Sequence, residues 1–203
     1  DIVVTNPPFS LFREYVAQLI EYDKKFLIIG NQNNATYKEI FHLIKENKIW
    51  LGYKSGNMAF KVPANSKERK TRFWIDESGQ KWRSLGNICW YTNLDIPKRH
   101  DNLPLYKTYS PEEYPTYDNY DAININKTAD IPCDFDGVMG VPITFLDKYS
   151  PEQFDILGMS ASAGYNPDIV GIPFKGEKDA RPLINGKNTY ARVFIQKRKQ
   201  SEQ

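Results

Sequence analysis

The chain has 203 residues, of which 40% are hydrophobic, 14% aromatic and 26% charged, and its formal net charge is +2. This composition suffices for a packed core in one domain or slightly more, and the small net charge indicates no class of partner. There is no run of about 18 apolar residues and no secretory leader pattern, so we expect a soluble, cytoplasmic protein that does not span a membrane. Cys89 and Cys133 suggest no disulfide framework, which fits a reducing compartment.

Charge is distributed unevenly along the chain. Residues 1–47 carry 5 basic and 6 acidic side chains, residues 48–108 carry 12 and 5, residues 109–160 carry 2 and 10, and residues 161–203 carry 8 and 4. A basic middle and tail separated by an acidic block fits a surface that faces a polyanion, with a solvated back. Ordinary surface patterning explains the same distribution equally well.

The first ten residues contain a short β-branched run that stops at Asn6-Pro7-Pro8-Phe9, where a helical pattern begins. Proline lacks an N–H group and fixes φ, so no strand continues through Pro7 and Pro8, and the residues before them favour extended conformations. Residues 1–5 therefore predict a strand, buried on both faces, that ends in a stiff turn. In open α/β sheets, ligands bind at the carboxyl ends of the strands.

This turn carries side chains with a specific chemistry. The Asn6 amide can accept and donate hydrogen bonds, and the Pro7 carbonyl is free to accept a second one. Phe9 offers a flat apolar face on which a planar heterocycle can stack. Two acceptors beside an aromatic plate suit a ring with an exocyclic amine, such as an adenine flipped out of a duplex. The alternative is a plain turn that only ends the strand.

A second strand–loop–helix unit follows the first. Residues 11–22 have apolar side chains at helical spacing, with Ser10 as the predicted N-cap, and residues 26–30 predict a second buried strand. Two such units in succession predict a parallel pair of strands. The polar residues 31–34 lie on the same rim as the first turn, where they line a ligand pocket or simply cap the next helix, residues 36–47.

The middle of the chain predicts an antiparallel hairpin that closes the sheet, with a basic excursion between its strands. The predicted strands are residues 49–51, 58–62, 73–75 and 87–94. The basic side chains in and beside the excursion are Lys67, Arg69, Lys70, Arg72, Lys81 and Arg83. Together with Trp74 and Trp82 they combine charge that seeks phosphate with aromatic faces, which is typical of nucleic-acid contact. An exposed loop over two core tryptophans is an equally good interpretation.

The remainder of the chain predicts a β-rich region. Lys98 and Arg99 lie in a short basic loop that contacts a phosphate or is simply solvated. Strands are predicted at residues 122–126, 138–146, 154–159 and 189–196, and Asn185-Gly186 between apolar runs is the strongest short hairpin signal in the chain. Three aspartates, Asp130, Asp134 and Asp136, have the chemistry of hard-metal ligands, but their spacing matches no calcium loop, so no metal is predicted.

The motif Asn6-Pro7-Pro8-Phe9 resembles that of amino-group methyltransferases that use S-adenosylmethionine. Residues 1–31, together with residues 88–94 and 137–142, more closely resemble the EcoRI-type adenine-specific DNA methyltransferase family, over most of the chain. The resemblance implies that Asn6, Pro7, Pro8 and Phe9 are catalytic, that S-adenosylmethionine is the cofactor, and that the partner is double-stranded DNA, within a restriction–modification system. It also implies direct attack of the adenine amino nitrogen on the cofactor's methyl group.

We expect these residues to be a fragment of the enzyme. No glycine-rich turn for the cofactor is found, and the chain starts at Asp1 on a strand of a kind normally interior to a larger sheet. In the family that segment lies upstream, so Asn6 is expected to contact only the edge of the cofactor.

The predicted fold class is α/β. Residues 1–95 are the C-terminal part of a Rossmann-like methyltransferase core, and residues 96–203 are a β-rich region for recognition of the DNA target. Two alternatives stay open: a non-catalytic DNA-recognition subunit, and an amino-methyltransferase that acts on RNA guanine or protein glutamine.

Overall fold

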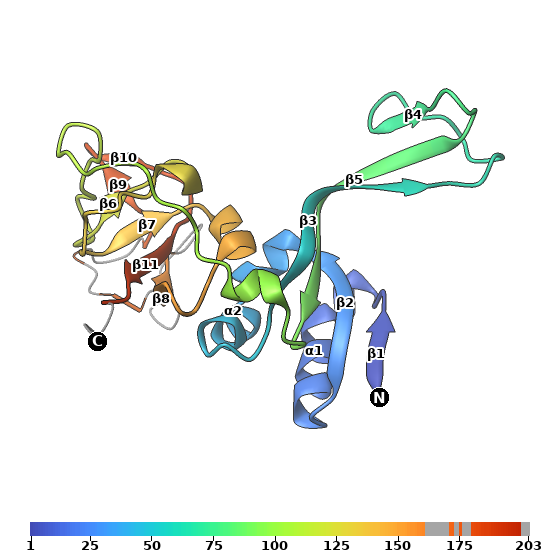
Figure 1. Cartoon of the computed structure of the whole chain (residues 1–203), viewed down its shortest axis with the longest axis horizontal. Helices are drawn as coiled ribbons and strands as arrows, with labels where there is room; N and C mark the ends of the chain where they lie inside the picture. Colours follow the sequence, from blue (N-terminus) through green and yellow to red (C-terminus); the bar gives the residue numbers. More distant parts are fainter. Residues whose placement is uncertain (161–170, 173–174, 176–179, 200–203) are drawn as a thin grey trace. The chain divides into compact units, whose positions relative to one another are not determined.

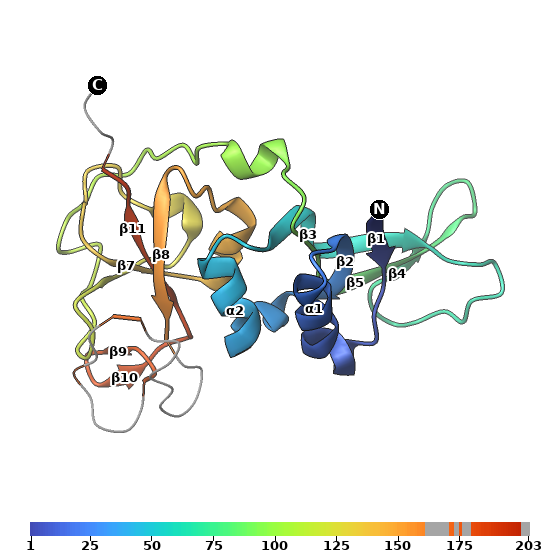
Figure 2. The same ribbon diagram turned by 90° about the horizontal axis from the view of Figure 1, so that it is seen from below.

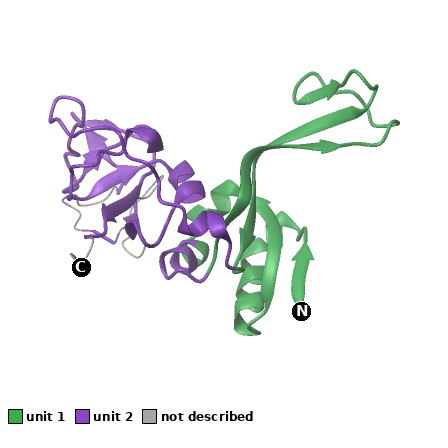
Figure 3. Ribbon diagram, viewed as in Figure 1, with its two compact units in different colours: residues 1–40, 49–94 green, residues 41–48, 95–203 purple. Residues whose placement is uncertain are grey.

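The computed structural model describes residues 1–160, 171–172, 175 and 180–199, which form a mixed α/β structure divided into two compact units. Unit 1 comprises residues 1–40 and 49–94, and unit 2 comprises residues 41–48 and 95–203 (Figure 3). In the described part of the chain, none of the helices combines the length and the apolar character that a membrane span requires.

Unit 1 is built on a mixed sheet with the strand order β1-β2-β5-β3, and β4 pairs with β5 beside this path. Its elements, in chain order, are β1 (Ile2–Thr5), η1 (Phe9–Leu11), α1 (Phe12–Glu21), β2 (Lys25–Asn31), η2 (Gln32–Thr36), the start of α2 (Lys38–Lys45), β3 (Trp50–Lys61), β4 (Phe73–Ile75) and β5 (Lys81–Thr92) (Figure 1). β1 and β2 are parallel, as predicted, whereas β5 is antiparallel to both β2 and β3.

Helix α1 lies along one face of this sheet (Figures 1 and 2). The buried side chains of this layer include Phe12, Val16, Leu19, Phe26 and Ile28. Each contributes about 1.5–3 kcal/mol through burial. A Cβ atom on Gly30 would lie 2.5 Å from the Phe12 ring, so the close approach of α1 to the end of β2 requires glycine there.

The prediction that the first strand is buried on both faces is wrong for the described chain. The side chains of Ile2 and Val4 are 55% and 64% exposed, because α1 covers only the other face and β1 is an edge strand of the observed sheet. Ser10 is not an N-cap either. It lies inside η1, where the Leu11 N–H donates to the Pro8 carbonyl at 3.0 Å, and α1 begins only at Phe12.

The middle segment forms longer strands than expected. Residues 49–51 and 58–62 are predicted as two short strands, but β3 is continuous. The residues between them stay in the strand because its pairing with β5 shifts register there. β5 begins at Lys81 rather than near residue 87. β2 pairs with residues 88–92 of β5, whereas β3 follows β5 back to residue 82. The ribbon of β3, β4 and β5 therefore extends beyond the rest of the sheet (Figure 1), and residues 57–85 are named the arm.

Unit 2 contains the end of α2 and a four-stranded sheet with the order β6-β7-β11-β8. Its other elements are η3 (Pro97–His100), β6 (Ile123–Asn124), η4 (Thr128–Asp130), β7 (Met139–Val141), η5 (Ile143–Lys148), β8 (Phe154–Met159), β9 (Leu183–Ile184), β10 (Lys187–Asn188) and β11 (Val193–Lys197). β6 and β7 are parallel, and the other pairs of this sheet are antiparallel. Its core includes Tyr117, Tyr120, Ala122, Ala180 and Phe194.

Two predictions for this unit are confirmed and two need correction. The strand at residues 154–159 is β8, and Asn185-Gly186 forms the turn of the β9–β10 hairpin, with φ values of 51° and 71°. The strand expected at residues 138–146 ends at Val141, because Pro142 starts the 3-10 turn η5 instead. The strand expected at residues 122–126 shrinks to the two residues of β6.

Candidate active site and nucleic-acid interface

The Asn6-Pro7-Pro8-Phe9 turn lies at the carboxyl rim of the parallel pair. Thr5, the last residue of β1, is paired with Ile28 of β2, so Asn6 leaves the sheet at this rim. The Pro7 side chain is buried, whereas Asn6, Pro8 and Phe9 are exposed, with Phe9 47% exposed. The turn is thus anchored through one proline and presents the remaining side chains outward.

The groups of this turn that are expected to bind a ligand make no hydrogen bonds or ring contacts with other described residues. Within the described residues, the Asn6 amide and the Pro7 carbonyl have no hydrogen-bond partner, and the Phe9 ring has no aromatic neighbour. The Pro8 carbonyl, in contrast, accepts the Leu11 N–H and so begins η1. The turn therefore presents two free acceptors and one free ring face, and it is held in place by the buried Pro7 and by the hydrogen bond to Pro8.

The polar loop after β2 bonds mainly to itself. The Asn31 side chain accepts the Asn33 N–H at 2.9 Å, and the Thr36 hydroxyl donates to the Asn33 carbonyl at 2.7 Å. The buried Tyr91 hydroxyl donates to the Asn31 carbonyl at 2.9 Å, and burial raises the pKa of Tyr91 well above its usual value. The Asn31 and Thr36 side chains thus cap the loop, whereas the buried Asn34 Nδ2 atom has no hydrogen-bond partner in the described chain. Contact of Asn6 with the edge of the cofactor stays a prediction.

Sequence reasoning missed one pair of side chains at the same rim. The Arg13 guanidinium carbon lies 5.0 Å from the centroid of the Tyr37 ring, a cation–π distance. Arg13 is in the first turn of α1, and Tyr37 directly precedes α2, so both follow loops at the carboxyl ends of β1 and β2. That shared position after two rim loops is the signal that could have identified them.

The predicted DNA-binding side chains of the arm differ in how firmly they are held. Lys67, Arg69 and Lys70 are exposed and have no partner among the described residues. The Arg72 guanidinium lies against the Gly86 backbone, and the Lys81 ammonium donates to the Ser66 carbonyl at 3.2 Å. Arg83 is paired with Phe60 on one side and Phe73 on the other. The whole arm carries seven basic and three acidic side chains.

The tryptophans of the arm are not core residues, which removes one alternative for this segment. Trp74 is 42% exposed, and its ring lies parallel to that of Trp82, with 6.2 Å between centroids and 4° between planes. The Trp82 indole N–H donates to Asp76 at 2.8 Å. Hydrogen bonds from Ser78 and Trp82 lower the pKa of Asp76 to about 2. Asp76 therefore stays ionised and fixes the turn between β4 and β5.

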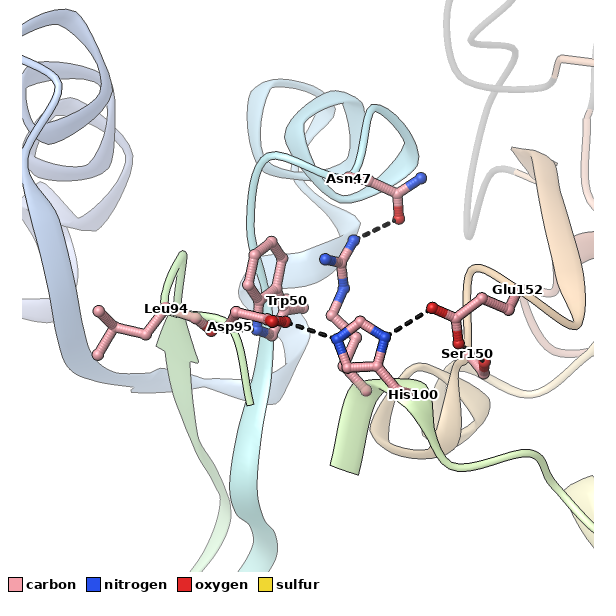
Figure 4. Close-up of polar contacts among 8 residues, drawn as sticks. Asn47, Trp50, Leu94, Asp95, His100, Ser150 and Glu152 are labelled. Atoms are coloured by element: carbon pink, nitrogen blue, oxygen red, sulfur yellow. Dashed lines mark hydrogen bonds and ion pairs between the residues drawn. The ribbon is translucent and has the colours of Figure 1, made fainter. Parts of the chain in front are cut away.

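Lys98 and Arg99 do have partners within unit 2. The Lys98 ammonium lies 2.7 Å from Asp147, and Arg99 donates to Asn47 at 2.8 Å. His100 lies between Asp95 and Glu152, at 2.7 and 2.6 Å (Figure 4). These contacts favour a structural role for the loop, and DNA contact by Lys98 and Arg99 stays a prediction. In the described ranges, no group of three His, Cys, Asp or Glu side chains is arranged to hold a metal ion.

Comparisons with known proteins bear on this arrangement. Residues 1–199 match the family model described as adenine-specific methyltransferase EcoRI. The chain is 53% identical to the type II methyltransferase M.EcoRI of Escherichia coli, over 98% of the chain and 58% of that protein. It is 38% identical to the type II methyltransferase M.MgeORF184P of Mycoplasma genitalium, over 97% of the chain and 64% of that protein. No solved structure matches the chain significantly. The chain thus spans less than two thirds of the length of these relatives.

Proposed function

The chain belongs to the EcoRI family of adenine-specific methyltransferases, and from this premise we propose that it carries the target-base site of a site-specific DNA methyltransferase. The reaction is transfer of a methyl group from S-adenosylmethionine to N6 of a flipped-out adenine in double-stranded DNA, within a cytoplasmic restriction–modification system. The names of the relatives, type II methyltransferases, support this assignment.

The observation that carries the proposal is the free turn at the carboxyl rim. The adenine amino nitrogen is a weak nucleophile, because its lone pair is conjugated with the ring. Hydrogen bonds accepted by the Asn6 amide oxygen and the Pro7 carbonyl draw this nitrogen toward tetrahedral geometry and localise the lone pair. Phe9 stacks on the flipped ring and holds it in line, which is mainly a positioning effect. Pro8 keeps Asn6 and Phe9 at a fixed separation, since its φ is restricted.

The cofactor supplies an electrophilic methyl group on a sulfonium sulfur when it is bound. We place its main binding site outside these residues, with Asn6 at its edge. The loop after β2 is partly capped by its own Asn31 and Thr36 side chains, which is compatible with this placement. In this proposal, residues 1–95 are the C-terminal part of a Rossmann-like core, and residues 96–203 recognise the DNA target.

DNA contact is assigned to the arm. Its exposed cations, Lys67, Arg69 and Lys70, are free of protein partners in the described chain, which suits them to phosphate contact. Arg72, Lys81 and Arg83 add charge beside them but are held in the ribbon.

The test is product analysis with the whole protein. Incubated with S-adenosylmethionine and unmethylated duplex DNA, it should yield N6-methyladenine in nuclease digests of the DNA. These 203 residues alone should be inactive. Methylation of guanine in RNA or of glutamine in protein, with unmodified DNA, would move the assignment to another amino-methyltransferase. DNA binding without any transfer would leave a recognition subunit.

A further inference from the structure

The arm carries an aromatic row that the proposed methyl transfer does not use. Lys61 of β3 is paired with Trp82 of β5, and Trp82 is paired with Trp74 of β4. Directly paired residues of neighbouring antiparallel strands project from the same face. Three strands therefore contribute one side chain each to a single row across that face.

The row is ordered by specific contacts. The Lys61 ammonium lies 5.6 Å from the centroid of the Trp82 ring, and the Trp74 ring is parallel to Trp82 at 6.2 Å. Because β3 and β4 flank β5, Lys61 and Trp74 approach Trp82 from opposite sides. The hydrogen bond from the Trp82 indole to Asp76 fixes the middle ring.

The row is open at one end. β4 is an edge strand that pairs only with β5, so no further strand of the described chain lies beyond Trp74. Trp74 is 42% exposed, and within the described residues its only ring neighbour is Trp82. An exposed, flat ring at the end of a stack is an available site for one more planar group.

The surroundings of Trp74 indicate the chemistry of that group. The arm carries seven basic against three acidic side chains, and the cations Lys67, Arg69 and Lys70, unpaired among the described residues, precede β4 directly in the chain. A partner that offers both planar rings and negative charge is a nucleic acid. Charge complementarity therefore favours nucleic acid over an apolar protein surface.

We propose that the free face of Trp74 stacks on the base of an unpaired DNA nucleotide, while the neighbouring cations hold the flanking phosphates. In a paired duplex both faces of an interior base are covered by its neighbours, so only a single-stranded or locally opened segment offers a face. The inference rests on the proposed function, since extrusion of a target adenine opens the duplex locally. Stacking on Trp74 would make the arm bind opened DNA more tightly than a fully paired duplex, a preference that charge alone does not provide.

The test is binding of the whole protein to an oligothymidine strand and to a fully paired duplex of the same length. Trp74→Ala should weaken binding to the single strand about 5- to 100-fold, the range for loss of one base–aromatic stack, and change duplex binding less than about twofold. Trp74→Phe should keep single-strand affinity within about threefold and lose part of the tryptophan quenching on binding.

The matched control is Ile75→Ala. Ile75 is the next residue of β4, is 49% exposed and points to the opposite face, so its truncation should change neither affinity. Equal losses for both variants, equal losses on both DNAs, or no loss for Trp74→Ala would each overturn the stacking role. Those results would leave N6-methyladenine formation intact, whereas failure of the proposed function would appear as its absence in the unaltered protein.

Discussion

The carboxyl rim of β1 and β2 and the arm present their exposed groups in opposite ways. At the rim, Asn6 and Phe9 belong to one short turn that is anchored by the buried Pro7 and by the bond from Leu11 to Pro8. In the arm, the loop cations Lys67, Arg69 and Lys70 have no described contact that fixes their side chains. The turn at the rim therefore holds its side chains in fixed directions, whereas the arm presents positive charge on side chains that are not held in place.

This difference predicts two kinds of response to substitution. Methyl transfer depends on the angle and distance between reacting atoms, so a single change at the rim should be severe. Phosphate attraction is long-ranged and shared among several cations, so changes in the arm should be graded and additive. A comparison of turnover with DNA affinity can separate the two.

The largest effect is expected for Asn6→Ala. Loss of one fixed electrostatic contact to developing charge costs roughly 10²- to 10³-fold in turnover, and DNA affinity should change less than about twofold because the arm is intact. Single-turnover methyl transfer and DNA binding by the whole protein measure both quantities.

Asn33→Ala is the matched control, because Asn33 is an exposed asparagine in the neighbouring rim loop whose own contacts are made by its backbone. It should retain turnover. A loss of less than about tenfold for Asn6→Ala, or equal losses for the two variants, would remove Asn6 from the proposed role.

The rim could be predicted from sequence because its determinants are local. Apolar periodicity identified β1, α1 and β2, and Pro7 and Pro8 located the end of the first strand. Two strand–loop–helix units then placed Asn6 at the carboxyl rim. The missed detail is η1 in place of a Ser10 cap: the Leu11 N–H donates to the Pro8 carbonyl, so a 3-10 turn that contains Ser10 comes before α1.

The arm could be predicted only in outline. Its charges are visible in the sequence, but the row of Lys61, Trp82 and Trp74 depends on the pairing register of three strands. The Asp76 turn, a readable turn pattern, fixes the register between β4 and β5. The register between β3 and β5 also depends on two shifts whose positions the sequence does not show. Likewise, the partners of Lys98 and Arg99 lie far away in sequence, at Asp147 and Asn47.

An intermediate effect is expected when Lys67, Arg69, Lys70 and Arg72 are all replaced by glutamine. The slope of log affinity against log salt should fall by about one for each phosphate that the arm no longer neutralises, while turnover at saturating DNA is retained. Because the Arg72 guanidinium packs against Gly86, a variant that keeps Arg72 separates loss of charge from loosening of the arm.

The control for this set is the double variant Lys24→Gln and Lys25→Gln. Both lysines are exposed and lie at the amino end of β2, opposite the rim, so their loss should leave the salt slope nearly unchanged. If the arm variant had the slope of the unaltered protein, the arm cations would be ordinary solvated charges.

The smallest effect is expected for His100. Its side chain has two fixed carboxylate partners, so its substitution should affect stability rather than DNA affinity. Hydrogen bonds to Glu152 and Asp95 raise the pKa of His100 above 6.5 in the folded state (Figure 4). A raised folded pKa means that the stabilisation is fully present below about pH 6.5 and is lost as pH rises through the folded value. The His100 hydrogen bond also lowers the pKa of Asp95 below 3.8, so that contribution is present above pH 3.8 and is lost on acidification.

Denaturant unfolding between about pH 6 and about pH 8.5 tests the basic side of this window. The free energy of unfolding should fall modestly over this range, since His100 is partly exposed, and His100→Gln should remove most of the fall. His42→Gln is the control, because His42 lies in α2 without a hydrogen-bonded carboxylate in the described chain. If His100→Gln kept the pH dependence of the unaltered protein, the contacts of His100 with Asp95 and Glu152 would not contribute to the change in stability with pH.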